Sequence, residues 1–137
     1  MSYAGDVQPE QAFAALQNDA AAVLVDVRTR AEWTYVGLPE VSPPGRGPVL
    51  VEWQRFPDGR VNDRFVEELR AAGVSPGTPV YFLCRSGVRS VAAAEAATAA
   101  GLGPAYNIVH GFEGPLDEQG RRTVAGWKKA GLPWRQG

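Results

Sequence analysis

The sequence predicts an α/β domain built on a mainly parallel β-sheet. Its 137 residues alternate strand-like and helix-like segments, which is the pattern of βαβ units. Hydrophobic residues make up 45% of the chain, so a real core is expected and disorder is not. Two of the strand-like segments are nearly continuous apolar runs, as in strands covered on both faces. We see no internal repeat and no linker, so we expect one domain over residues 1–137.

The first third of the chain contains one clear helix signal and one clear strand signal. Pro9 suits the first position of a helix, which we expect over Pro9–Asn18 because Leu16 and several alanines form an apolar stripe. Ala22–Val27 (AVLVDV) is almost entirely apolar and predicts a buried strand. The segments that follow are expected to be a short helical turn over Ala31–Tyr35, a Pro- and Gly-rich stretch over Gly37–Pro48, and a strand over Val49–Trp53.

The rest of the chain continues the alternation of strands and helices. Asn62 is a candidate cap for a helix over Asp63–Ala72, which Gly73 would close. Pro79–Leu83 (PVYFL) predicts a second buried strand, and the Ala-rich segment Val88–Ala100 predicts a helix. The remaining expected elements are a loop with a PDG turn over Phe56–Gly59, a strand over Ala105–Val109, and a helix over Arg122–Ala130 that ends at Gly131.

Charge and cysteine content exclude several classes of function. The formal net charge is -1, which argues against a nucleic-acid or anionic-membrane surface as the main partner. The chain has one cysteine, so neither an internal disulfide nor a multi-cysteine metal site can form. The amino terminus has no basic segment followed by an apolar one, and no apolar run approaches the ~18 residues that span a bilayer. We therefore expect a cytoplasmic protein.

The segment with chemical character is Val80–Ser90 (VYFLCRSGVRS), where a predicted strand ends at Cys84 and a helix begins a few residues later. Parallel sheets place ligands at this edge, next to the unpaired N–H groups of the following helix. Gly87 permits a tight loop, and Arg85 and Arg89 add two positive charges. Each of these features favours a thiolate and the binding of an anion. The alternative is an inert, buried cysteine flanked by surface arginines.

Three motifs, taken in order, resemble the rhodanese family. CRSGVRS resembles the family's active-site loop, and LVDVRTRAEW resembles its upstream motif, Asp-x-Arg-x-x-x-Glu followed by an aromatic residue. The stretch NIVHGFEGPLDEQGRRTVAGWKKAGLPW resembles the end of small bacterial rhodaneses, with Gly111, Gly114 and Trp127 at matching places. The resemblance covers nearly the whole chain. It departs after the upstream motif, where Gly37–Ser42 (GLPEVS) lacks the family's Gly-His-Ile-Pro-Gly-Ala.

The resemblance implies a five-stranded parallel sheet flanked by helices on both faces, and a sulfurtransferase that works through a persulfide. Cys84 would be the nucleophile, and no metal or organic cofactor would be needed. The partners implied are a small sulfur-donor anion such as thiosulfate and a thiophilic acceptor such as cyanide, a thiol or a sulfur-accepting protein. The residues that would cradle the persulfide are Arg85, Ser86, Gly87, Val88 and Arg89.

Two other functions remain open at this stage. Cysteine phosphatases and arsenate reductases also hold anions in a loop, but their Cys-x5-Arg pattern places Arg where this chain has Ser90. With Arg89 one residue earlier, the loop is shorter and suits a single sulfur atom better than a tetrahedral oxyanion. The second alternative is a non-catalytic sulfur carrier or binding module, because fold alone does not establish turnover.

Several further side chains are candidates for supporting the site. Asp26, Arg28, Glu32 and Trp33 belong to the upstream motif, and the charged ones are expected mainly to pair with one another. His110, the only histidine, follows the last predicted strand and is expected to be a loop residue rather than a base. Ser86 is the expected hydroxyl contact to a bound anion, with Ser90 as a second candidate. The four tryptophans are expected to pack in or against the core, with Trp33 and Trp53 as candidate pocket walls: Trp33, Trp53, Trp127 and Trp134.

Overall fold

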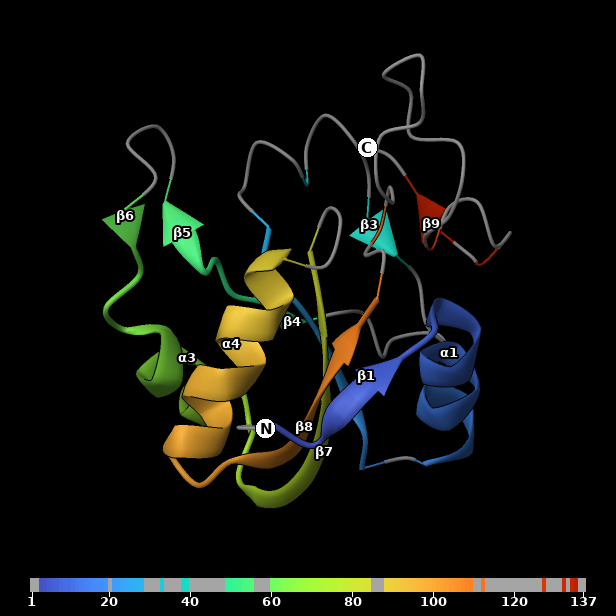
Figure 1. Cartoon of the computed structure of the whole chain (residues 1–137), viewed down its shortest axis with the longest axis horizontal. Helices are drawn as coiled ribbons and strands as arrows, with labels where there is room; N and C mark the ends of the chain where they lie inside the picture. Colours follow the sequence, from blue (N-terminus) through green and yellow to red (C-terminus); the bar gives the residue numbers. More distant parts are fainter. Residues whose placement is uncertain are drawn as a thin grey trace.

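A parallel five-stranded sheet forms the centre of the molecule, as seen in the computed structural model of the chain (Figure 1). The strand order is β1-β8-β7-β2-β4, and every neighbouring pair is parallel. The sheet strands are β1 (Gly5–Val7), β2 (Val23–Asp26), β4 (Val49–Leu50), β7 (Pro76–Leu83) and β8 (Gly103–Ile108). The structure describes residues 3–19, 21–28, 33, 38–39, 49–55, 60–84, 88–109, 112, 127, 132 and 134–135.

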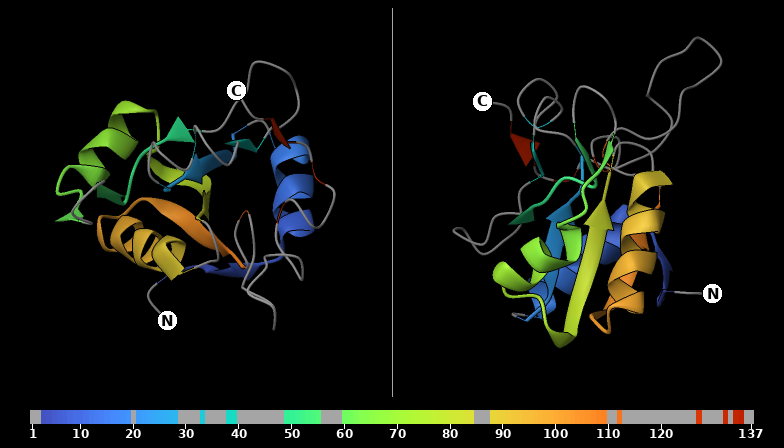
Figure 2. Two further views of the ribbon diagram at one scale, coloured as in Figure 1. Left: turned by 90° about the horizontal axis from the view of Figure 1, so that it is seen from above. Right: turned by 90° about the vertical axis from the view of Figure 1, so that its left-hand side faces the viewer.

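Helices cover both faces of this sheet, so the expected α/β class and the five parallel strands are confirmed. The helices are α1 (Pro9–Asn18), α3 (Phe65–Ala71) and α4 (Val88–Ala99). Seen from above in Figure 2, α3 and α4 lie on one side of the sheet and α1 lies on the other. Pro9 begins α1 as expected, and Ala12 and Leu16 form its buried stripe. None of the helices that the structure describes is long and apolar enough to cross a membrane.

Alternating side chains of the central strand fill two separate cores. In β7, Val80 and Phe82 point to the face covered by α3 and α4, whereas Tyr81 and Leu83 point to the face covered by α1. Both faces are buried, which explains why β7 has no polar alternation in its sequence. Cys84 follows two residues after Phe82 and therefore belongs to the α3/α4 side.

Several expected boundaries need correction. The expected strand Val49–Trp53 is shorter, because regular strand structure covers only Val49–Leu50, although the Val51 and Trp53 N–H groups still donate to the Asp26 and Val27 carbonyls. The expected helix Asp63–Ala72 begins later, with Arg64 as its N-cap. Asn62 instead accepts a hydrogen bond from the Arg64 backbone N–H at 3.1 Å and donates to the Glu52 carbonyl at 2.9 Å. Its side chain closes a turn before the helix, which is a common use of asparagine.

Three strand pairings at the periphery were not expected. β1 adds an edge strand beside β8, with Gly5, Asp6 and Val7 in register with Tyr106, Asn107 and Ile108. The two small antiparallel pairs join β3 (Leu38–Pro39) to β9 (Trp134–Arg135) and β5 (Gln54–Arg55) to β6 (Arg60–Val61). The expected loop over Phe56–Gly59 and helix over Arg122–Ala130, apart from Trp127, lie outside the described residues, as does most of the turn expected over Ala31–Tyr35.

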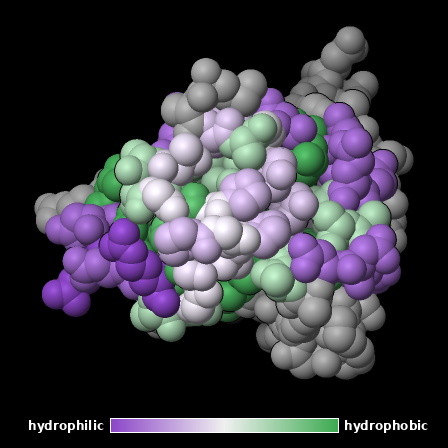
Figure 3. All heavy atoms as spheres, turned by 90° about the horizontal axis from the view of Figure 1, so that it is seen from below, coloured by the Kyte–Doolittle hydropathy of each residue, from purple (hydrophilic) through white to green (hydrophobic). Residues whose placement is uncertain are grey.

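Among the described residues, the end of the molecule opposite Cys84 shows no large apolar surface. Figure 3 views the molecule from below, at the end of the sheet where β7 and β8 begin. Hydrophobic residues appear there as small groups separated by hydrophilic ones. Single exposed apolar residues of this kind are normal for a protein surface.

Candidate active site at the end of β7

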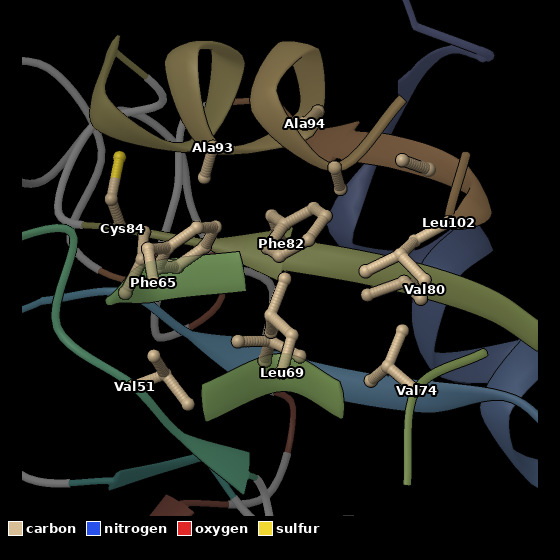
Figure 4. Packing of buried hydrophobic residues seen from close by; sticks show 14 residues of the cluster. Val51, Phe65, Leu69, Val74, Val80, Phe82, Cys84, Ala93, Ala94 and Leu102 are labelled. Carbon is tan, nitrogen blue, oxygen red and sulfur yellow. The ribbon is translucent and has the colours of Figure 1, made fainter. Parts of the chain in front are cut away.

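Cys84 occupies the carboxyl end of the central strand. It follows β7 directly, and α4 begins at Val88. The strand end is tied on both sides, because the Val27 N–H donates to the Leu83 carbonyl and the Phe112 N–H donates to the Cys84 carbonyl, each at 2.8 Å. Figure 4 shows the Cys84 side chain directed from the sheet toward the α4 side, next to Phe65. The fold therefore fixes the backbone that carries the thiol.

The sulfur contacts the first turn of α4. The Ser90 backbone N–H donates to Cys84 Sγ at 3.4 Å, and the Ser90 Oγ lies 3.3 Å from the same sulfur. N–H groups in the first turn of a helix have no partner within the helix and carry the positive end of its dipole. The hydrogen bond therefore favours negative charge on Sγ, as the sequence argument requires.

Cys84 is also deeply buried. Its exposed fraction is 1%, and it belongs to the hydrophobic cluster formed by β2, β7, α3 and α4. One side of the thiol thus meets hydrocarbon and the other side meets Ser90. A reagent reaches this sulfur only by displacing neighbouring atoms, so the residue has the contacts of a reactive cysteine and the burial of an inert one.

The structure describes only part of the expected persulfide cradle. Val88 opens α4, and Arg89 is half-buried in the same turn. Ser90, the second candidate for a hydroxyl contact to a bound anion, contacts the Cys84 sulfur. The other residues named for the site, namely Arg85, Ser86, Gly87, Glu32 and His110, lie outside the described residues.

Asp26 and Arg28 form a buried ion pair next to the strand end. Both side chains are fully buried, with Arg28 Nη2 at 2.6 Å from Asp26 Oδ2 and Arg28 Nε at 2.9 Å from Asp26 Oδ1. The guanidinium carbon lies 4.3 Å from the centre of the Phe112 ring. Since the Phe112 N–H donates to the Cys84 carbonyl, this ion pair supports the backbone that carries Cys84. The pairing is the role expected for these two residues.

The tryptophans that can be assessed contribute to packing. Trp127 is fully buried and packs edge-on against Phe13 at 5.7 Å between ring centres. Trp53 is half-buried and packs edge-on against Phe65 at 5.0 Å. Trp33 is half-buried and helical. The side chain of Trp134 lies outside what the structure describes. Among the described residues, no group of three His, Cys, Asp or Glu side chains is arranged to hold a metal ion.

Sequence reasoning missed two polar residues that connect to the site. Ser90 Oγ donates to Asn107 Oδ1, and Asn107 Nδ2 donates to Asp6 Oδ1 at 3.0 Å. The available signal was Asn107 itself, a polar residue in the second half of a largely apolar strand, where it is buried. A buried amide needs hydrogen-bond partners, so its presence there indicates a polar network.

Comparison with known proteins identifies the family. Residues 5–137 match the family model described as the STR4 middle domain. The protein RC0915 of Rickettsia conorii is 37% identical over 120 residues, which span 88% of this chain and 87% of that protein. The chloroplastic rhodanese-like domain-containing protein 4 of Arabidopsis thaliana is 29% identical over 126 residues, or 91% of this chain but 24% of that protein.

Solved structures agree with this assignment. Rv0390 from M. tuberculosis has a TM-score of 0.90 and 55% sequence identity, covering 98% of this chain and 99% of that chain. Two more distant structures share the fold. The polysulfide-sulfur transferase homodimer of Wolinella succinogenes has a TM-score of 0.68 at 20% identity, covering 99% of this chain and 80% of that one. A rhodanese-like domain protein of Staphylococcus aureus has a TM-score of 0.60 at 23% identity, covering 84% of this chain and 94% of that one. The chain therefore belongs to the STR4 middle-domain family, within the rhodanese-like proteins.

Proposed function

We propose that this protein is a sulfurtransferase in which Cys84 carries the transferred sulfur as a persulfide. The observation that carries the proposal is the position of the only cysteine: its Sγ lies at the end of β7 and accepts a hydrogen bond from a first-turn N–H of α4. Membership in the rhodanese-like family supports it. The fold is also shared with a protein whose name describes polysulfide-sulfur transfer.

The reaction consists of two balanced displacements. The Cys84 thiolate attacks the outer sulfur of thiosulfate, the S–S bond of the donor breaks, and sulfite leaves with the bonding electron pair. Cyanide then attacks the outer sulfur of the persulfide, the new S–S bond breaks, and thiocyanate leaves while Cys84 returns as a thiolate. No oxidant or reductant is consumed in either step. Donor and acceptor bind in turn, so the kinetics should be ping-pong.

The loop residues take complementary roles in this proposal. Backbone N–H groups between Arg85 and Arg89 would surround the terminal sulfur, and Gly87 would allow the tight path. The guanidinium groups of Arg85 and Arg89 would attract the donor anion. The Asp26–Arg28 pair would act only by holding the strand end in place, since its charges already satisfy each other.

Burial of the nucleophile favours a second candidate function, which is stoichiometric sulfur carriage. Cys84 is 1% exposed, so attack by a small dissolved acceptor is hindered. A partner protein that reshapes the site would then be the true acceptor. The two candidates differ in turnover: an enzyme forms many molecules of thiocyanate per chain, whereas a carrier accepts sulfur once and releases it only to its partner.

Thiocyanate formation from thiosulfate and cyanide tests the proposed role of Arg89. We expect the Arg89→Ala variant to lose about 10- to 100-fold in kcat/KM for thiosulfate, because a charge-assisted hydrogen bond to the donor is removed. Arg70→Ala is the matched control, since Arg70 contacts the Ala100 carbonyl at the other end of α4. A helix of this length separates the two positions by roughly 16 Å. Equal activity in the two variants would remove Arg89 from the proposed cradle.

A further inference from the structure

A line of hydrogen-bonded side chains runs from the edge of the sheet to the Cys84 sulfur. Asp6 on β1 is in register with Asn107 on β8, and Asp6 Oδ1 accepts from Asn107 Nδ2 at 3.0 Å. Asn107 Oδ1 accepts from Ser90 Oγ at 2.5 Å, and Ser90 Oγ lies 3.3 Å from Cys84 Sγ. Asp6 is exposed, whereas Asn107 and Ser90 are buried. We call these three residues the Asp6–Asn107–Ser90 chain.

The direction of each hydrogen bond follows from the protons available. A carboxylate can only accept, so the Asn107 amide must turn its nitrogen toward Asp6 and its oxygen toward Ser90. The Tyr3 hydroxyl also donates to Asp6 Oδ1, at 2.8 Å. This hydrogen bond, together with burial and the negative charges of Asp6 and Glu95, raises the pKa of Tyr3 above its usual 10.0. Asp6 Oδ1 therefore accepts from both Tyr3 and Asn107.

The Ser90 hydroxyl has one proton, and it donates this proton in its hydrogen bond to Asn107 Oδ1. The lone pairs of Ser90 Oγ are then the groups that face Cys84 Sγ. A thiol can donate its proton to them, but a thiolate faces repulsion or must draw the hydroxyl away from a buried carbonyl oxygen. We propose that Asp6 and Asn107 are positioning residues that turn the Ser90 hydroxyl away from the sulfur, so that this hydroxyl does not donate a hydrogen bond to a Cys84 thiolate.

This arrangement opposes the Ser90 backbone N–H, which favours the thiolate. The backbone N–H of Ser90 therefore stabilises negative charge on Sγ, whereas the hydroxyl of the same residue does not. The inference deepens the proposed function, on which its biological meaning rests: the chain withholds one hydrogen bond that could stabilise the attacking thiolate. The charged and titratable groups of the described elements around it are Tyr3 and Asp6 near β1, Arg89 and Glu95 on α4, and the Asp26–Arg28 pair of β2.

Alkylation by iodoacetamide tests the inference without any sulfur donor. Because the protein has one cysteine, loss of free thiol reports Cys84 alone. The pH at which the alkylation rate is half its maximum, the midpoint, reports deprotonation of the Cys84 thiol. The maximal rate reached at high pH reports how easily the reagent reaches the sulfur. We expect Asn107→Ala to move the midpoint about one pH unit lower, which is a roughly tenfold faster reaction below the midpoint. Asp6→Ala should shift it in the same direction, because the Asn107 amide becomes free to turn.

The same two substitutions in a Ser90→Ala background provide the control. If they act through the Ser90 hydroxyl, neither should move the midpoint once that hydroxyl is gone. A shift that persists there would instead reflect lost charge or entry of water, and it would overturn the inference, as would unchanged or higher midpoints in the single variants. Asp6 is exposed, so Asp6→Ala keeps the test available if Asn107→Ala does not fold. A midpoint shift in a protein that transfers no sulfur would refute the proposed function alone.

Discussion

Replacing Cys84 by serine is expected to abolish sulfur transfer, lowering thiocyanate formation from thiosulfate and cyanide by roughly 10³-fold or more. A serine hydroxyl cannot form the persulfide on which both displacements depend. The fold should survive, because the Ser90 N–H and hydroxyl that now face Sγ remain as hydrogen-bond partners for the new oxygen. Steady-state assays on the purified variant measure the effect.

A second substitution at Cys84 helps to separate lost chemistry from lost folding. Cys84→Ala removes the polar atom altogether, and it should be equally inactive while unfolding cooperatively in urea. If either variant folded and kept a rate within a factor of two of the parent protein, Cys84 would not be the sulfur carrier. Inactivity caused by unfolding would show as a lost unfolding transition, which separates it from lost chemistry.

The second large effect is expected for Arg28→Ala, which should destabilise the folded state by about 3–5 kcal/mol. The substitution leaves the Asp26 carboxylate buried with no guanidinium to neutralise it. It also removes the cation that lies over the Phe112 ring. The free energy of unfolding, obtained from urea denaturation, measures the loss.

A double substitution distinguishes lost pairing from lost volume. Asp26→Leu combined with Arg28→Met removes both charges and keeps apolar bulk, so it should cost less than Arg28→Ala alone. A change of no more than about 1 kcal/mol in Arg28→Ala would contradict the structural role assigned to the pair. Because Phe112 ties this region to the Cys84 carbonyl, the single variant should also lose sulfur transfer even under conditions where it stays folded.

The central elements of the fold could be predicted because their sequences carry local signals. Continuous apolar runs identified β2 and β7, and a helix-compatible composition with few interruptions identified α1 and α4. The strand β1 has only three residues and includes the charged Asp6, so its sequence does not look like a strand. It exists because β8 offers it a register of backbone hydrogen bonds. The pairing of β3 with β9 joins segments far apart in the chain, which no local pattern reveals.

From the sequence, only Cys84 and the loop that follows it could be assigned to the site. The strand–loop–helix pattern located Cys84 and predicted that α4 would begin beside it, because both signals are local. The contact between Ser90 and Sγ could not be predicted in the same way, because Ser90 lies in the first turn of α4 and meets the sulfur only through the folded path of the chain. Asn107 and Asp6 come from two other strands, so their connection to the thiol depends on the sheet order.

The most direct test of the account is the intact mass of the protein after incubation with thiosulfate and removal of excess reagent. We expect a mass increase of one sulfur atom on the parent protein, reversed by a thiol reductant and absent in Cys84→Ser. An unchanged mass under conditions where iodoacetamide still alkylates Cys84 would show a reachable thiol that takes no sulfur from thiosulfate, and would contradict the proposed persulfide.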